Sequence, residues 1–295
     1  AALYRSVLPA ENILLVNTPT RFNSETTKNL ARRLAENLEA PFVELPIDSF
    51  INETVSQIDD LQIPSPSDMK TLHLTGFMKE NIQARDRSTR ILATLSSAFG
   101  GIFTCNANKT ELTVGYGTLY GDLSGALAAT ADLWKHQIYA LGRTLNRYFD
   151  KNMIPDEIFT VRPSAELSEN QDITKGLGDP LIYEYHDFLF RSFIEPWNRI
   201  TPEEILTWYS ENCLEEKLGT PVSIKSIFKT HHDFITDLEK WWNLFAGFAV
   251  AKRIQAPPLL AVSRRPYGYD LRESQIAPYY TDTYIHLKNS LLSNG

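Results

Sequence analysis

Residues 13–45 read ILLVNTPTRFNSETTKNLARRLAENLEAPFVEL, and this stretch decides the fold class. Residues 13–17 form a short apolar run before a proline, which favours a strand buried on both faces. Ser24 then caps a helix whose one face carries Leu30, Leu34 and Leu38. Residues 42–45, enclosed by prolines, predict a second strand. A strand, helix, strand order of this kind predicts a parallel sheet flanked by helices.

The rest of the chain extends this pattern and then departs from it. Residues 57–70 form a polar excursion, residues 81–99 an amphipathic helix ended by Gly100-Gly101, and residues 102–105 another strand. Further on, apolar spacing predicts helices over residues 127–148, 182–193, 202–213 and 223–251. We expect one domain over residues 1–295, with an α/β core (1–165) and a mainly helical C-terminal layer (166–295). The apolar helices of that layer either complete the core or pack against a second subunit, and we expect a homo-oligomer.

Composition narrows the class of protein. The formal charge is -7 over 295 residues, and basic residues are interspersed with acidic ones, which argues against nucleic acid as a partner. The two cysteines, Cys105 and Cys213, lie far apart and predict neither a disulfide framework nor a zinc site. No apolar run approaches the ~20 residues of a membrane span. We therefore expect a cytoplasmic protein that does not enter a membrane.

The segment of residues 104–122, TCNANKTELTVGYGTLYGD, carries the most chemistry. It follows a predicted strand, at the edge where ligands bind in open parallel sheets. Asn106 and Asn108 offer amides, Glu111 offers a carboxylate for a divalent cation, and three glycines let the backbone approach a ligand. From these residues alone, a glycine-rich turn between a strand and a helix is an equally valid interpretation, and indeed the more frequent one.

Several runs, taken in order, resemble NAD synthetases. They are NANKTE at 106–111, VGY at 114–116, LYGD at 119–122 and DLWKHQIY at 132–139, with ENIQAR at 80–85, RPSAEL at 162–167, and Lys252-Arg253 followed by APP at 256–258. The resemblance covers most of the chain. It implies a Rossmann-like fold of the adenine nucleotide α-hydrolase type, and an enzyme that amidates deamido-NAD (nicotinic acid adenine dinucleotide) to NAD with ATP.

The resemblance also implies roles for individual residues. Glu111 is expected to hold Mg²⁺, and Lys135, the expected catalytic residue, to contact the ATP phosphates together with Ser164. Asn106 matches an ATP-site position of the family. Residues expected to face deamido-NAD are Asn81, Arg85, Glu111, Asp122 and Lys252.

Two departures refine the subfamily. Leu119 and Ala126 stand where the shorter, ammonia-dependent enzymes carry a lysine and an aspartate. The pattern instead resembles the synthetase region of the larger, glutamine-dependent enzymes, which also carry a glutaminase domain. The family's N-terminal phosphate loop is not found, and residues 1–8 resemble the inside of a helix without a cap, so we expect the chain to be an N-terminally truncated part of a longer protein. The nitrogen donor, ammonia or glutamine, stays open.

Two other functions remain compatible with the sequence. One is another amidating ATP pyrophosphatase of the same fold. The other is a non-catalytic binding or assembly module, which the missing phosphate loop favours. His231-His232 and Trp241-Trp242 are interpreted as packing or interface residues, since metal sites need three or four converging ligands and buried aromatics contribute large areas. Cys105 is interpreted as a buried strand residue.

Overall fold

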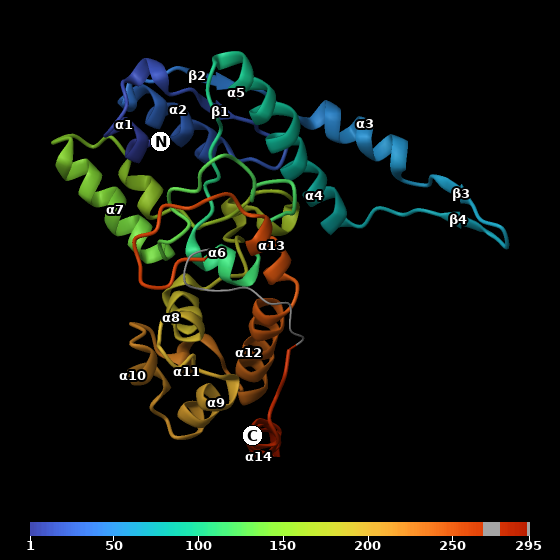
Figure 1. The fold of residues 1–295 in the computed structure, drawn as a ribbon, viewed down its shortest axis with the longest axis vertical. Helices are drawn as coiled ribbons and strands as arrows, with labels where there is room; N and C mark the ends of the chain where they lie inside the picture. Colours follow the sequence, from blue (N-terminus) through green and yellow to red (C-terminus); the bar gives the residue numbers. More distant parts are fainter. Residues whose placement is uncertain (268–277, 294–295) are drawn as a thin grey trace. The chain divides into compact units, whose positions relative to one another are not determined.

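Two short strands, β1 (Leu15–Asn17) and β2 (Phe42–Glu44), lie parallel to each other and confirm the predicted order of elements. In the computed structural model, which describes residues 1–267 and 278–293, Leu15 pairs with Phe42 and Asn17 with Glu44 (Figure 1). All residues of both strands are half-buried. The prediction of full burial on both faces is therefore wrong: within the described residues the sheet has two strands, and both are edge strands.

The helix between these strands, α2 (Glu25–Leu38), begins where its sequence predicts. Ser24 Oγ accepts a hydrogen bond from the backbone N–H of Thr27 at 3.3 Å, which satisfies one of the free donors of the first turn. The apolar face of α2 is turned inward, and Leu38 packs in a core cluster with Leu145 and Met153. The predicted cap and apolar face are both confirmed.

The polar stretch after β2 is more ordered than its sequence predicts. Helix α3 (Asp48–Ile58) leads into an antiparallel hairpin of β3 (Gln62–Pro64) and β4 (Met69–Thr71), which projects away from α4 (Figure 1). Every residue of both hairpin strands is exposed. Strands that bury neither face have no alternation of apolar and polar residues, so the sequence pattern could not reveal them.

A continuous helical segment returns from the hairpin in three parts. These are α4 (Gly76–Arg85), a π-helical stretch η2 (Asp86–Leu92) and α5 (Ala93–Phe99). The segment ends at Gly100, whose φ of 75° is the left-handed conformation common at helix C-termini. The helix predicted over residues 81–99 is confirmed. It begins earlier than predicted, at Gly76, with Thr75 as its N-cap.

The segment after α5 differs most from its prediction. Instead of a strand over residues 102–105, Thr104 forms one isolated parallel bridge with Leu127. The helix predicted from residue 127 begins later, as α7 (Lys135–Tyr148). The reason is that Leu127 O accepts from Cys105 N at 3.0 Å and Ala128 N donates to Pro258 O at 2.9 Å. Backbone groups bound in this way are not available for helical hydrogen bonds.

Helices form the C-terminal part, as predicted. Those over residues 182–193 and 202–213 are confirmed as α8 (Tyr183–Ile194) and α9 (Pro202–Ser210). The helix predicted over residues 223–251 is interrupted, because Thr230 and Asp233 form a capping box that starts a new helix. Its parts are α11 (Ile224–Ile227), α12 (His231–Ala246) and α13 (Ala249–Gln255).

Shorter elements complete the described residues. They are α1 (Ala2–Arg5), α6 (Lys109–Val114), α10 (Leu214–Leu218), α14 (Asp282–Ser293) and 3₁₀ turns at Ala10–Asn12, Asp156–Phe159, Glu169–Gln171 and Ile173–Lys175. In α1, the N-cap Ala1 makes no side-chain capping bond, as expected for its sequence. No helix within residues 1–267 or 278–293 is both long and apolar enough to cross a membrane.

Of the residues set aside in the sequence, Trp241 and His231 pack as interpreted, whereas His232 is exposed and Cys105 is buried but lies outside any strand. Trp241 is buried and donates its Nε1–H to Asp237 at 2.9 Å. His231 is half-buried with Nδ1 2.9 Å from the Tyr209 hydroxyl, and the described part of the chain offers it no group of metal-ligating neighbours. Cys105 is a buried free thiol.

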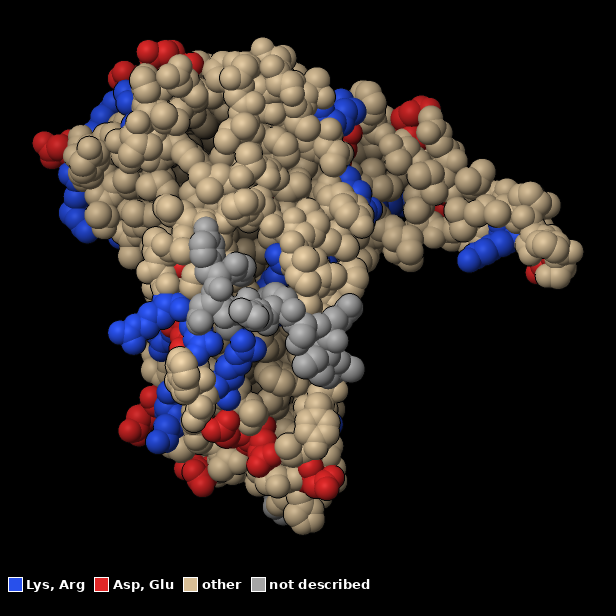
Figure 2. Space-filling view, viewed as in Figure 1, with Lys and Arg blue, Asp and Glu red and all other residues tan. Residues whose placement is uncertain are grey.

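The described residues separate into two units that interleave in sequence. The α/β unit contains Ala1–Phe103, Thr118–Gly125 and Tyr139–Pro180, and the helical unit contains Thr104–Gly117, Ala126–Ile138 and the described residues from Leu181 onward. The single domain expected from the sequence stays a prediction. A parallel strand pair combined with many helices confirms the α/β class. Figure 2 shows both Lys and Arg side chains and Asp and Glu side chains on this face, several of them next to each other.

Candidate functional site

The chemistry-bearing segment of the helical unit is built around α6, a short helix that the sequence did not predict. Asn108 caps it: Asn108 Oδ1 accepts from Glu111 N at 2.9 Å, and Glu111 Oε2 accepts from Asn108 N at 3.0 Å. This reciprocal pair is a capping box, and a carboxylate at this end is favoured by the helix dipole. Glu111 is thus held in one orientation by its own helix.

Lys135, the first residue of α7, lies beside Glu111 in the helical unit. Its Nζ is 3.8 Å from Glu111 Oε1, and the two side chains are 20% and 19% exposed. The ammonium also lies 4.9 Å from the centre of the Tyr183 ring, a cation–π contact. The structure therefore brings together the predicted metal ligand and the predicted catalytic lysine, which are 24 positions apart in the sequence (135 − 111).

Asn106 and Lys252 are also in the helical unit. Asn106 is exposed, with Oδ1 3.4 Å from Thr104 Oγ1. Lys252 donates from Nζ to Gly115 O at 2.6 Å and to Gly117 O at 2.5 Å. At Gly115, with φ of 64°, a side chain would bring Cβ to 2.9 Å from Ala249 Cα, so only glycine fits. Lys252 and Gly115 together hold the glycine-rich turn against α13.

A buried ion pair that includes Lys109 of α6 was not predicted. Lys109 and Asp132 have fully buried side chains, and Lys109 Nζ donates to Asp132 Oδ1 at 2.9 Å. The second carboxylate oxygen accepts from the backbone N–H groups of Val262 and Ser263 at 2.7 and 2.6 Å. Burial by itself raises the pKa of the Asp132 carboxyl, but the hydrogen bonds from Lys109, Val262 and Ser263 outweigh it and lower the pKa below its usual value.

No sequence signal distinguishes Lys109 from a surface lysine. It stands among polar residues and is separated by 23 positions from Asp132, so neither periodicity nor a local motif marks the pair. Lys109 and Asp132 both lie in runs that carry the resemblance to NAD synthetases, but the resemblance did not imply a role for either. Their pairing as a buried ion pair is visible only in the tertiary structure.

In the α/β unit, three predicted substrate-binding residues are hydrogen-bonded to the turn at residues 118–122. Asp122 belongs to this turn, and Asn81 and Arg85 contact it from α4. Asn81 Oδ1 accepts from Thr118 Oγ1 at 2.6 Å, and Asp122 Oδ1 accepts from Thr118 N at 2.7 Å. Arg85 donates from Nε to Leu119 O at 3.2 Å. Thr118, which the sequence did not single out, is the residue that links Asn81 to Asp122.

Ser164 lies in a loop of the α/β unit that is tied to the start of α2. Its hydroxyl donates to Gln171 O at 2.6 Å and accepts from Glu166 N at 3.1 Å. Glu166 is buried and accepts hydrogen bonds from Ser24 N and Thr27 Oγ1 at 3.1 and 2.6 Å. The predicted phosphate-contacting loop is thus anchored by a carboxylate at a helix N-terminus.

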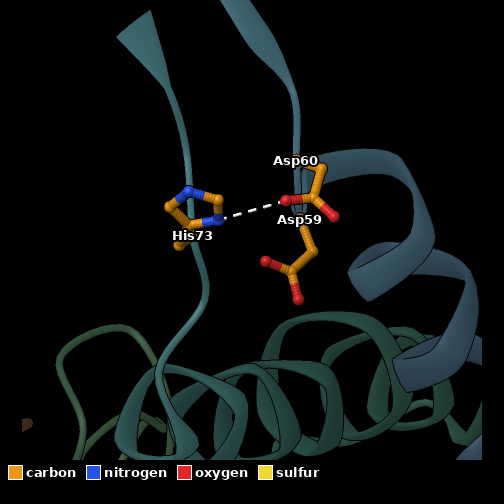
Figure 3. A group of neighbouring side chains, drawn as sticks. All are labelled: Asp59, Asp60 and His73. Atoms are coloured by element: carbon orange, nitrogen blue, oxygen red, sulfur yellow. Dashed lines mark ion pairs between the residues drawn. The ribbon is translucent and has the colours of Figure 1, made fainter.

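Asp59, Asp60 and His73 form the one group of possible metal-ligating side chains within residues 1–267 and 278–293 (Figure 3). His73 Nδ1 is 3.1 Å from Asp60 Oδ1, and both side chains are mostly exposed. Asp59 already accepts from Leu74 N at 2.8 Å and from Lys79 Nζ at 3.1 Å. Those two hydrogen bonds lower the pKa of the Asp59 carboxyl. The cluster closes the base of the β3–β4 hairpin.

Comparison with known proteins assigns the chain to a family. The model of the NAD synthase family matches residues 1–223. The glutamine-dependent NAD(+) synthetase of Thermotoga maritima is 32% identical over 205 residues, 70% of this chain and 33% of the relative. The NH(3)-dependent NAD(+) synthetase of Helicobacter hepaticus is 31% identical over 219 residues, 74% of each chain. The chain spans about a third of the first of these relatives.

A solved structure supports the fold. The crystal structure of a glutamine-dependent NAD(+) synthetase from Cytophaga hutchinsonii superposes with a TM-score of 0.65 at 19% identity, over 94% of this chain and 40% of the other. The similarity extends past residue 223, where the family match ends, and confirms the predicted fold class. By the match of the family model and the identity to its members, the chain belongs to the NAD synthase family.

Proposed function

We propose that this chain is the synthetase region of a glutamine-dependent NAD synthetase and catalyses the ATP-dependent amidation of deamido-NAD. The observation that carries the proposal is the Glu111–Lys135 pair, with the ammonium 3.8 Å from the carboxylate and both groups accessible. This pair lies inside the part of the chain that matches the family. A carboxylate and a lysine side by side can hold a metal-bound triphosphate between them.

The proposed reaction has two steps. An oxygen of the nicotinate carboxylate attacks the α-phosphorus of ATP, the bond from that phosphorus to the β-phosphate oxygen breaks, and pyrophosphate leaves. Ammonia then attacks the carboxyl carbon of the adenylate, the bond to AMP breaks, and the nitrogen loses one proton to give the amide. No protein nucleophile is needed, so the side chains act by positioning and by charge neutralisation.

Lys135 suits the first step. Its ammonium is held over the Tyr183 ring and beside Glu111, which limits its freedom before ATP binds. A preoriented cation near the phosphates stabilises the charge that develops on departing pyrophosphate. Ser164, in its anchored loop, is proposed as a second phosphate contact, and Asn106 as part of the ATP site.

The donor set at Glu111 fits Mg²⁺. Nucleotide sites bind Mg²⁺ through one or two carboxylates completed by substrate phosphates and water. Glu111 offers one carboxylate, with Oε2 used by the capping box and Oε1 turned toward Lys135. Bound there, the ion would neutralise phosphate charge during the first step.

Asn81, Arg85, Asp122 and Lys252 are proposed to face deamido-NAD. Arg85 donates to the backbone carbonyl of Leu119, and Lys252 donates to the carbonyls of the glycine turn. Substrate contact would therefore exchange these hydrogen bonds for bonds to substrate oxygens. We also propose that a glutaminase domain supplies the ammonia. The protein is further proposed to be a homo-oligomer and to be located in the cytoplasm.

The test is Lys135→Ala in the full-length protein, supplied with deamido-NAD, MgATP and ammonia. We expect pyrophosphate release to fall by about 10²- to 10³-fold, the usual effect of removing one preorganised charge-stabilising group. Lys240→Ala is the matched control, because Lys240 also lies over an aromatic ring, Trp241, at 4.3 Å. Unchanged pyrophosphate release by Lys135→Ala would remove the main support for the proposal. Activity on another carboxylate in place of deamido-NAD would identify a different amidating enzyme of this fold.

A further inference from the structure

Asp187 is a buried carboxylate in α8 that receives hydrogen bonds from α6 and from the first turn of α7, which also lies in the helical unit. It is fully buried. Its Oδ1 accepts from Thr110 Oγ1 at 2.5 Å, and its Oδ2 accepts from His136 N at 2.8 Å and lies 2.7 Å from His136 Nδ1. Thr110 precedes Glu111 in α6, and His136 follows Lys135 in α7. One carboxylate therefore touches the neighbour of each member of the Glu111–Lys135 pair.

Thr110 adds a second connection between the same helices. Its hydroxyl donates to Asp187 and accepts from Lys135 N at 3.2 Å. The first N–H groups of α7 have no partners within the helix, and here they are bound by side chains of α6 and α8. The start of α7 is thereby fixed against the start of α6. Each of these helices carries one residue of the proposed phosphate site near its start.

We infer that Asp187 is a positioning residue, which sets the distance between Glu111 and Lys135 through Thr110 and His136. This inference rests on the proposed function. In this inference Asp187 does not contact the phosphates. It affects the rate through the positions of the Glu111 carboxylate and the Lys135 ammonium. Misplacement of a reacting or charge-stabilising group by about 1 Å can reduce a rate about 10²-fold.

The helical unit contains a second network that serves as an internal comparison. Asp237 in α12 accepts from Trp241 Nε1 at 2.9 Å and lies 3.0 Å from His186 Nε2. It joins α8 to α12 through side-chain groups. Its two hydrogen-bonding partners, His186 and Trp241, are not those of Asp187. Loss of Asp237 should therefore change stability without changing the chemistry.

The experiment compares four variants of the full-length protein: Asp187→Asn, Thr110→Val, Thr110→Ser and Asp237→Asn. We expect Asp187→Asn and Thr110→Val to lower kcat for pyrophosphate release by about 10- to 100-fold, with a smaller change in the KM for ATP. Thr110→Ser keeps the hydroxyl and should recover most of the rate. Asp237→Asn should lower the unfolding midpoint and leave kcat within about twofold of the wild type.

A double variant separates positioning from a general loss of stability. If Asp187 acts through Lys135, adding Lys135→Ala to Asp187→Asn should reduce kcat much less than it does in the wild type, because coupled residues are not additive. Full additivity, or a normal kcat for both Asp187→Asn and Thr110→Val, would overturn the inference. A wild-type protein that releases no pyrophosphate would instead overturn the proposed function. If Asp187→Asn does not fold, the kcat values of Thr110→Val and Thr110→Ser test the inference in its place.

Discussion

Buried carboxylates of the two units are stabilised in different ways. In the α/β unit, the groups that donate to Glu166 within the described residues are neutral and lie at the start of α2, the Ser24 N–H among them. In the helical unit, Asp132 accepts from the buried ammonium of Lys109 at 2.9 Å as well as from backbone N–H groups. A helix N-terminus provides a partial positive charge, whereas a lysine provides a full one.

This difference decides what is left behind when one partner is removed. Loss of Glu166 leaves neutral donors without an acceptor. Loss of Lys109 leaves a charged carboxylate buried in the protein, which is more unfavourable. The two units should therefore respond unequally to the loss of one buried charged side chain, and the variants below test that order.

Lys109→Met should show the largest effect. Methionine has a similar length and no charge, so the variant leaves Asp132 without its cation. We expect the free energy of unfolding to fall by about 3–5 kcal/mol, the usual result of breaking a buried pair on one side. Urea unfolding followed by circular dichroism measures this change.

The double variant Lys109→Met/Asp132→Asn serves as the control. Asparagine keeps an oxygen for the Val262 and Ser263 N–H groups and removes the charge, so most of the lost stability should return. If the single and double variants were equally unstable, the buried charge would not be the cause. The contrast between the two units would then fail.

Glu166→Ala should have an intermediate effect. It removes the acceptor of three neutral donors, and we expect a loss of about 1–3 kcal/mol in the free energy of unfolding. Glu166 also has φ of 47°, a left-handed backbone conformation. Glu166→Gly should therefore be about 1 kcal/mol more stable than Glu166→Ala, since glycine adopts this conformation without steric conflict. A loss from Glu166→Ala larger than that from Lys109→Met would reverse the comparison.

His73→Ala should have the smallest effect. His73 and Asp60 are 72% and 80% exposed at the base of the hairpin, and solvent screens such a pair almost completely. We expect no measurable shift of the unfolding midpoint. Added Zn²⁺ tests the alternative, because a midpoint that rises with Zn²⁺ in the wild type but not in His73→Ala would reveal a metal site there.

Where the sequence predicted the fold well, the signal was local. The cap at Ser24 and the leucines of α2 act within a few residues of each other, and the structure confirms both. The start of α7 was predicted too early, because the hydrogen bond from Cys105 N to Leu127 O joins segments that are distant in sequence. The spacing of apolar residues does not show which backbone N–H and C=O groups are hydrogen-bonded to distant segments.

The sequence by itself determined the class of fold, the family resemblance and the types of side chain in the candidate site. Only the tertiary structure showed that Glu111 and Lys135 are neighbours, that Lys109 and Asp132 form a buried pair, and that Asp187 is buried. The physical reason is that burial and pairing of charges depend on contacts between helices far apart in sequence. A lysine in a polar run has the same local pattern whether it ends in solvent or inside the protein.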